Sequence, residues 1–262
     1  MIRVTVLGSG TVDPVPSRAS SGFHLQIAQR QIVVDLGGGT LRNAVSAGLD
    51  IAQLDTVVLT HFHPDHTSDL VPFLFARKYA TGDWRLSPSL TLYGPRGTGE
   101  FLDRIFSAWP SVRPEAQTLH VVELAPGERY RLLEDTSLEV FTAVHGDMEA
   151  LSLRFSIKDK VVAFSGDTAL CPGVVQAAQR ADLFLCECSC FPRGEEPLYC
   201  RTVHLAWEDV AEICASAQPR ELVVTHLYEP VVQRKPNPGD SLSQVLRIPV
   251  TLASDLAVFE VA

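Results

Sequence analysis

Residues 56–66 read TVVLTHFHPDH, an apolar run that leads directly into a cluster of polar side chains. The first five residues have the character of a short buried strand. The next six include His61, His63, Asp65 and His66, which are all metal-ligand types. An exposed, unordered His-rich loop is the alternative, but such tracts rarely follow a buried strand so sharply. Because a rigid sheet can hold a loop full of ligands, we predict a metal site here.

Three more ligand-type residues follow strand-like runs further along the chain. His145 comes after LEVFTAV, Asp167 after VVAFSG and His226 after ELVVT. Taken singly, a histidine after a strand is more often a structural residue than a ligand. Together with the first cluster, these positions predict ligands gathered at one edge of an α/β scaffold, where binding sites of such folds lie.

The rest of the chain alternates between strand-like and helix-like patterns. We expect strands at 2–7, 23–36 (a pair), 91–95, 119–124, 137–144, 150–157, 160–165, 183–187, 222–225 and 248–261 (a pair), and helices at 40–47, 67–80, 98–109, 173–180 and 205–216. Residues 229–240, rich in proline, are expected to form a surface loop. Because no linker or composition break interrupts this alternation, we predict one α/β domain over residues 1–262.

Composition narrows the class of protein. The chain is 46% hydrophobic, which is ample for a packed core, and its net charge of −9 argues against non-specific binding of nucleic acid. No apolar stretch is long enough to span a bilayer, and residues 1–10 resemble a first strand rather than a signal peptide, so we expect a cytoplasmic protein without a membrane partner. The six cysteines are then expected to be reduced thiols. The alternating cysteines of CECSC (186–190) are interpreted as buried small hydrophobes, with a thiolate metal site as the alternative.

The order of these motifs resembles that of the metallo-β-lactamase superfamily over nearly the whole chain. The resemblance implies a four-layer αβ/βα sandwich with two divalent metal ions at the edge of its two sheets, Zn²⁺ being expected and Mn²⁺ the alternative. It also implies the ligands: His61, His63 and His145 for one ion, Asp65, His66 and His226 for the other, and Asp167 as the bridge. Asp167 stands where lactamases of the superfamily often have cysteine, and His63 where its di-iron branch has glutamate. Both departures favour hydrolysis over antibiotic cleavage or redox chemistry.

Within the superfamily, the chain is most similar to the ribonuclease Z-like branch. The similar segments are LGSGTVDPVPSRASSG (7–22), DLGGGT (35–40), LYGP (92–95) and SGDT (165–168). The resemblance assigns Glu187 to orient His204, which would contact the scissile phosphate or protonate the leaving group. The alternatives are a solvated carboxylate and a helix-start histidine. Only 22 positions separate His145 from Asp167, which leaves no room for the tRNA-binding arm of ribonuclease Z itself.

We therefore predict a compact phosphodiesterase that cleaves a small or cyclic phosphodiester with a hydroxide bound between the two ions. Asp65 would orient that nucleophile, and His204 would act as general acid. Asp35 and Thr60 are candidate hydrogen-bond partners of the ligand imidazoles. The alternatives are a carboxylic ester, lactone or thioester hydrolase, a ribonuclease Z-type RNA 3′-processing endonuclease, and a non-catalytic metal-binding member. A homodimer is expected by analogy alone, and His24 and His120 are interpreted as structural.

Overall fold

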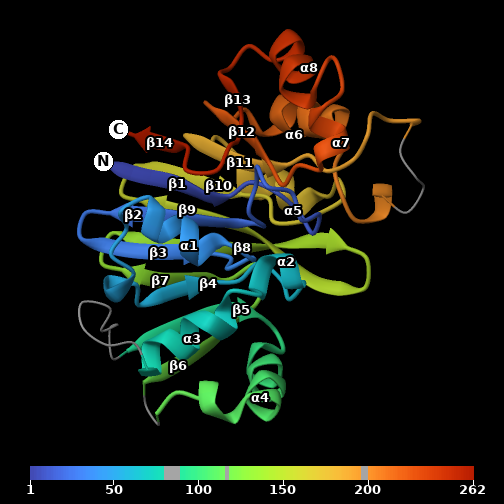
Figure 1. The fold of residues 1–262 in the computed structure, drawn as a ribbon. Coiled ribbons are helices and arrows are strands. Elements are labelled where there is room, and N and C mark those ends of the chain that lie inside the picture. The colour runs from blue at the N-terminus through green and yellow to red at the C-terminus, as the bar shows by residue number, and fades with distance from the viewer. Residues whose placement is uncertain (80–88, 116–117, 196–199) are drawn as a thin grey trace. The chain divides into compact units, whose positions relative to one another are not determined.

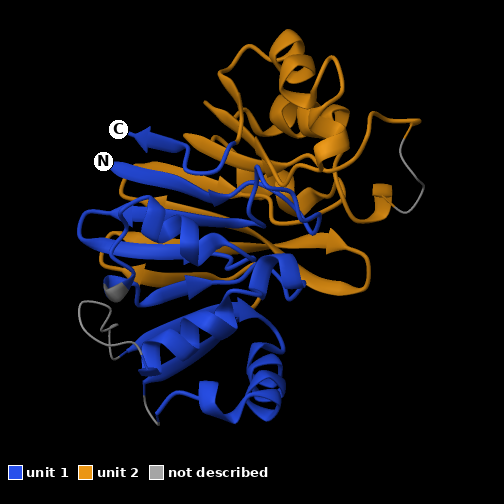
Figure 2. Ribbon diagram, viewed as in Figure 1, with its two compact units in different colours: residues 1–124, 254–262 blue, residues 125–253 orange. Residues whose placement is uncertain are grey.

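The computed structural model describes residues 1–79, 89–115, 118–195 and 200–262, and the chain divides into two compact units (Figure 2). Unit 1 comprises residues 1–124 and 254–262, and unit 2 comprises residues 125–253. Over the described ranges, each unit holds one mixed sheet of seven strands. The expectation of a single domain over residues 1–262 stays a prediction. None of the described helices is long and apolar enough to cross a bilayer.

The sheet of unit 1 has the strand order β14-β1-β2-β3-β4-β5-β6 (Figure 1). The strands are β1 (Ile2–Gly8), β2 (Gly22–Ile27), β3 (Arg30–Val34), β4 (Thr56–Val58), β5 (Leu90–Pro95), β6 (Leu119–Leu124) and β14 (Val258–Val261). Neighbouring strands are antiparallel from β14 to β3 and parallel from β3 to β6. Because β3 and β4 are parallel neighbours, the residues that follow them lie at the same edge of the sheet.

The helices of unit 1 pack against its sheet, and side chains from both form one buried apolar cluster. They are α1 (Thr40–Ser46), α2 (Pro64–Thr67), α3 (Leu70–Tyr79) and α4 (Thr98–Ala108), with 3₁₀ turns η1 (Ile51–Gln53) and η3 (Pro110–Val112). Phe73 of α3 belongs to the same buried cluster as Val57 and Leu92 of the sheet. Val58 points to the opposite face and is also fully buried, so both faces of β4 are covered. The expected helix at 67–80 is divided between α2 and α3, and residue 80 lies outside the described residues.

The sheet of unit 2 has the strand order β13-β12-β11-β10-β9-β8-β7. The strands are β7 (Arg129–Leu133), β8 (Thr136–His145), β9 (Met148–Ile157), β10 (Lys160–Phe164), β11 (Leu183–Glu187), β12 (Leu222–Thr225) and β13 (Val250–Leu252), and the helices are α5 (Pro172–Ala178), α6 (Trp207–Ala217), α7 (Glu229–Val232) and α8 (Pro238–Val245), with η4 (Cys200–Thr202). The helix α6 buries Val210, Ile213 and Cys214, as its amphipathic pattern predicts, in a cluster that also holds Leu242 of α8.

The two strands expected at 248–261 are present, and β13 belongs to the sheet of unit 2 and β14 to that of unit 1. Two sequence expectations are wrong. Residues 229–240 are not only a loop, because α7 lies within them and α8 begins at Pro238. The cysteines are not all reduced, because Cys190 and Cys200 form a disulfide, whereas Cys171, Cys186, Cys188 and Cys214 are free and buried. Strand β7 was not among the expected strands.

His24 is buried in β2, as its interpretation as a structural residue predicts. Its Nε2 donates to Gln31 Oε1 at 3.2 Å, and its Nδ1 has no partner among the described residues. Burial lowers the pKa of His24 from 6.5 to about 4, although the hydrogen bond to Gln31 acts in the opposite direction.

This depressed pKa predicts an acid-sensitive stability. Between pH 6.5 and 4 the unfolded chain binds the proton and the folded chain does not, so the free energy of unfolding falls as the pH falls through this window. The full effect of the shift is about 3 kcal/mol. Urea unfolding of chelator-treated, metal-free protein at pH 7 and pH 4.5 measures this change in the free energy of unfolding. The His24→Leu variant should lose most of the pH dependence. An equal pH dependence in the variant and the wild type would contradict the prediction.

Candidate metal centre

The first ligand cluster lies on the loop between β4 and α2. His61 follows β4, His63 occupies the N-cap position of α2 without a side-chain capping bond, and the one-turn helix itself carries Asp65 and His66. Pro64 at the first helical position suits this start, because a helix leaves its first amide groups without partners in the helix. Gly37 packs against this loop so closely that a Cβ there would lie 2.1 Å from the carbonyl oxygen of Asp65. The glycine run therefore permits close backbone approach to the ligand loop.

A buried carboxylate orders the histidines of this loop. Asp35 follows β3 with a left-handed φ of 58° and accepts hydrogen bonds from Thr60 N, Thr60 Oγ1 and His66 Nδ1, each at 2.8 Å. Because the Thr60 hydroxyl gives its proton to Asp35, its oxygen accepts from His61 Nδ1 at 3.0 Å. His61 and His66 therefore both carry their proton on Nδ1 and present Nε2 as the lone-pair nitrogen.

The donor atoms of this cluster lie within a few ångströms of one another. His61 Nε2 and His63 Nδ1 are 3.1 Å apart, and His66 Nε2 lies 4.0 Å from Asp65 Oδ2. His61 and His66 are fully buried, and burying such polar groups is unfavourable unless they gain partners. Imidazole nitrogens and carboxylate oxygens are suitable ligands for zinc. The chemistry of this donor set fits a divalent ion.

Asp35→Asn should weaken metal binding without unfolding the protein. Asparagine tolerates the left-handed conformation, but it loses the charge that holds three donors and turns an amide group toward one of them. Loss of such an outer hydrogen-bond partner typically lowers metal affinity by about 10–100-fold. Competition with a chromogenic chelator measures the affinity, and circular dichroism checks the fold. Unchanged affinity in a folded variant would show that Asp35 does not position His66.

The second set of ligand types lies at one edge of the sheet of unit 2. Strands β10, β11 and β12 are parallel. Strand β8 runs in the same direction as β10, because β9 is antiparallel to both. The residues at the ends of these strands therefore meet at a common edge, and they are His145, Asp167, Glu187 and His226.

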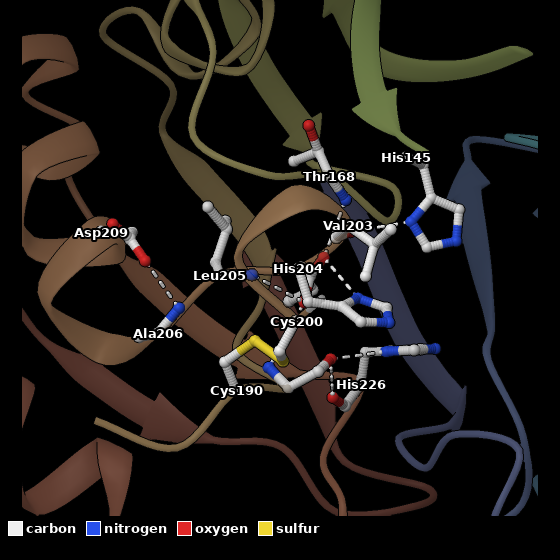
Figure 3. Close-up of a disulfide and its surroundings, with 12 residues drawn as sticks. His145, Thr168, Cys190, Cys200, Val203, His204, Leu205, Ala206, Asp209 and His226 are labelled. Carbon is white, nitrogen blue, oxygen red and sulfur yellow. Dashed lines mark hydrogen bonds and ion pairs between the residues drawn. A yellow bond between two sulfur atoms is a disulfide. The ribbon is translucent and has the colours of Figure 1, made fainter. Parts of the chain in front are cut away.

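The imidazoles of His145 and His226 are held through Nδ1, like those of His61 and His66. His145 Nδ1 donates to Val203 O at 2.7 Å (Figure 3). Ser189 Oγ donates to His226 O at 2.8 Å, so it accepts from His226 Nδ1, also at 2.8 Å. Both rings then turn Nε2 toward Asp167 Oδ2, at 3.8 Å from His145 and 3.3 Å from His226. This carboxylate oxygen lies between two lone-pair nitrogens, an arrangement that a cation would stabilise.

Glu187 and His204 are paired in the structure. His204 Nδ1 donates to Glu187 Oε1 at 2.9 Å, and this carboxylate also accepts from the backbone amides of Thr168, Ser189 and Leu205. Glu187 is 1% exposed, so the alternative of a solvated carboxylate is excluded. The ring of His204 lies near those of His145 and His226, with centroids 5.0 and 5.5 Å away. Asp167, His204 and His226 each offer a ligand atom within 4.8 Å of the others.

Two groups that hold histidine rings in unit 2, the Ser189 hydroxyl and the Val203 carbonyl, were not predicted from the sequence. Ser189 stands in CECSC, where the alternating cysteines draw attention to packing rather than to the serine. Val203 acts through its backbone carbonyl, which carries no signature in a sequence. The candidate partners Asp35 and Thr60, in contrast, do contact His66 and His61. His120 is exposed on β6 and takes no part in either cluster.

The fold and the donor groups are those of a metal-dependent hydrolase class, and comparison with known proteins identifies the family. The chain belongs to the family described as the Beta-lactamase superfamily domain, whose model matches residues 11–227. Ribonuclease Z of Agathobacter rectalis is 25% identical over 281 residues, covering 89% of this chain and 90% of that enzyme.

Solved structures agree with this assignment. The metallo-beta-lactamase fold protein YhfI of Bacillus subtilis superimposes with a TM-score of 0.83 at 21% identity, covering 99% of this chain and 100% of that one. A diphosphatase from the PhnP family has a TM-score of 0.73 at 18% identity, covering 100% and 98%. These structures confirm the predicted αβ/βα sandwich, and the similarity to ribonuclease Z confirms the predicted ribonuclease Z-like branch. Between His145 and Asp167 the chain forms only the β9–β10 hairpin, so this chain has no arm there.

Proposed function

We propose that this protein is a dinuclear metal-dependent phosphodiesterase that acts on a small or cyclic phosphodiester. The observation that carries the proposal is the hydrogen bond between the buried Glu187 and the partly buried His204, at the same sheet edge as Asp167 and His226. A histidine whose Nδ1 is held by a carboxylate can carry a second proton on Nε2 and deliver it to a departing oxygen. Departure of an alkoxide from phosphorus needs such a proton.

The metal ligands in this proposal are those that the resemblance implies. One ion would be held by His61, His63 and His145, and the other by Asp65, His66 and His226. Asp167 would bind both ions. Zn²⁺ is the expected metal, with Mn²⁺ as the alternative. The Nδ1 contacts of His61, His66, His145 and His226 support this assignment, because metal-binding histidines generally donate their other ring N–H to a neighbouring group. When bound, the ions supply Lewis acidity and a water nucleophile that is active at neutral pH. The family match at residues 11–227 includes parts of both units and supports one domain.

The residues of the chain have separate tasks in the reaction. Asp65 has a second carboxylate oxygen that can accept a hydrogen bond from the attacking water and orient it. Glu187 keeps the ring of His204 in place through Nδ1, so that Nε2 faces the leaving oxygen. General acid catalysis of this kind typically contributes about 10²–10⁴-fold to the rate. No such proton is needed when a stabilised thiolate leaves. The Glu187–His204 pair therefore favours phosphodiester cleavage over thioester hydrolysis.

Small substrates are favoured over RNA. The net charge of −9 and the short β9–β10 connection both argue against binding a long phosphate backbone. The similarity to ribonuclease Z keeps RNA 3′ processing as the second candidate, because it covers 89% of the chain. The structural similarity to a diphosphatase from the PhnP family supports a phosphate-containing substrate.

Turnover of bis(p-nitrophenyl) phosphate by zinc-loaded protein tests the proposal, beside a lactone, a thioester and a precursor tRNA. We expect phosphodiester cleavage that chelator abolishes and zinc restores, with weak acyl hydrolysis and no tRNA product. Dominant acyl turnover would overturn the proposal in favour of an esterase. Specific cleavage at the tRNA 3′ end would assign the protein to RNA processing instead. Sedimentation of the same preparation tests the expected homodimer.

A further inference from the structure

The disulfide Cys190–Cys200 joins two stretches of unit 2 that contact its histidines, one just before Cys190 and the other just after Cys200 (Figure 3). Glu187 and Ser189 immediately precede Cys190, and Val203 and His204 closely follow Cys200. The Glu187 carboxylate contacts His204, the Ser189 hydroxyl contacts His226, and the Val203 carbonyl contacts His145. The disulfide therefore stands between the groups that position three rings of the candidate site.

The backbone contacts around this disulfide transmit its position to His204. Cys190 N donates to Leu205 O at 3.0 Å, and the amides of Val203 and His204 both donate to Cys200 O, at 3.1 and 2.8 Å. The Cα atoms of the two cysteines are 6.1 Å apart, a separation that a disulfide normally spans. Ring position in general acid catalysis matters at the level of about 1 Å. The covalent link thus constrains η4 next to the loop that follows β11.

We propose that the Cys190–Cys200 disulfide is a reversible redox lock that positions His204 and, through the Val203 carbonyl, His145. The inference rests on the proposed function, because it assigns a consequence to the position of the proton donor. In the oxidised protein, the link holds η4 so that His204 stays on Glu187 and the Val203 carbonyl stays on His145. In the reduced protein, η4 is released from Cys190 and the proton donor loses its fixed position.

The chemistry is thiol–disulfide exchange with a low-molecular-weight thiol such as glutathione. The thiolate attacks one protein sulfur, the S–S bond breaks, and a mixed disulfide and one protein thiol result. A second thiol molecule then releases the other protein thiol and leaves as the small-molecule disulfide, so two electrons and two protons pass to the protein. Oxidation is the reverse reaction with glutathione disulfide. Disulfides in reducing compartments, where we expect this protein, are usually of this reversible, redox-sensing kind.

Three of the four free cysteines are unsuited to such exchange. Burial raises the pKa of the Cys214 thiol to about 12 and those of Cys186 and Cys188 well above their ordinary value. Their thiolate fraction at neutral pH is therefore very small. Cys200 is 8% exposed and Cys190 is 2% exposed, which makes Cys200 the more accessible sulfur of the pair. Cys214→Ser supplies the matched control, because Cys214 is a free buried thiol in α6.

The first experiment counts thiols and follows the histidines without using catalysis. Alkylation with N-ethylmaleimide in denaturant, followed by mass spectrometry, should label four cysteines after glutathione disulfide and all six after dithiothreitol. In metal-free protein, the NMR signals of the His204 and His145 rings should shift between these two states while that of His24 does not. Six labelled cysteines after oxidation, or histidine signals identical in both states, would overturn the inference.

The second experiment measures turnover of zinc-loaded protein on a phosphodiester with an alkoxide leaving group. We expect reduction to lower kcat by about tenfold or more, with zinc content unchanged, and glutathione disulfide to restore it. Cys200→Ser should show the low rate in both states, and Cys214→Ser should respond like the wild type. The reversible titration of the wild type keeps the test valid if Cys200→Ser misfolds.

The two experiments separate failure of this inference from failure of the proposed function. Equal turnover in both redox states, with four and six labelled cysteines, would overturn the lock and leave the phosphodiesterase assignment standing. No phosphodiester turnover in either state would refute the proposed function. Redox-dependent ring signals in that case would still show that the disulfide positions the histidines.

Discussion

Asp167→Ala is expected to remove metal retention and phosphodiester turnover together, with kcat/KM falling by at least about 10³-fold. Asp167 Oδ2 lies 3.8 Å from His145 Nε2 and 3.3 Å from His226 Nε2. Without it, two buried imidazoles remain close together with no carboxylate between them. A catalytic metal ion contributes several kcal/mol to transition-state stabilisation, and each 1.36 kcal/mol is about tenfold in rate.

Metal analysis after dialysis, together with kinetics at saturating added zinc, measures both effects of Asp167→Ala. The matched control is Asp159→Ala, because Asp159 is an exposed aspartate in the turn between β9 and β10. This control should retain the metal content and rate of the wild type. An Asp167→Ala protein that keeps its metal and its turnover would refute the dinuclear site.

His204→Ala is expected to retain the metal and lose turnover by about 10²–10⁴-fold, which is the usual contribution of a general acid. The loss should depend on the leaving group. An alkoxide needs the proton of His204 as it departs, whereas p-nitrophenolate leaves readily without one. The ratio of rates on an alkyl and a p-nitrophenyl phosphodiester should therefore fall in the variant. Glu187→Gln should reproduce this pattern in a weaker form, because the amide still reaches His204 but loses the charge that favours its protonation.

The same variant distinguishes a proton donor from a metal ligand. His204 lies in a group with Asp167 and His226 whose ligand atoms are within 4.8 Å of one another. If His204 binds an ion, His204→Ala will lose metal as well as turnover, and the two phosphodiesters will be affected equally. Full metal content with a selective loss on the alkyl substrate supports the proton donor.

Local sequence patterns were sufficient to predict most of the strands and the positions of the candidate ligands at strand ends. The run TVVLT before His61 and the run LVVT before His226 are apolar enough to require burial, and β4 and β12 lie there. The expectation of a loop at 229–240 was wrong for a local reason. Its prolines were interpreted as breakers, yet Pro230 and Pro238 stand in the first turns of α7 and α8, where proline is well tolerated. Asn237 confirms the second start, since its side chain accepts from Asp240 N at 2.9 Å.

Long-range pairing could not be predicted in the same way. The strands β13 and β14 follow each other closely in the chain but join different sheets, because β14 pairs with β1 at the far end of the sequence. The disulfide was missed because the expected cytoplasmic location predicted reduced thiols. Spacing among six cysteines also does not reveal which two sulfurs meet, and Cys190 and Cys200 meet only because η4 returns to the loop after β11.

By itself, the sequence determined the residue types of the candidate site and their places at strand ends, because apolar periodicity and side-chain chemistry are properties of short segments. Only the tertiary structure decided which nitrogen each imidazole presents. The partners of Nδ1 are the Asp35 carboxylate, the Thr60 and Ser189 hydroxyls and the Val203 carbonyl. Three of the four lie 31 to 58 positions from the histidine that they hold, and a hydrogen bond depends on distance in space, which only the folded chain sets.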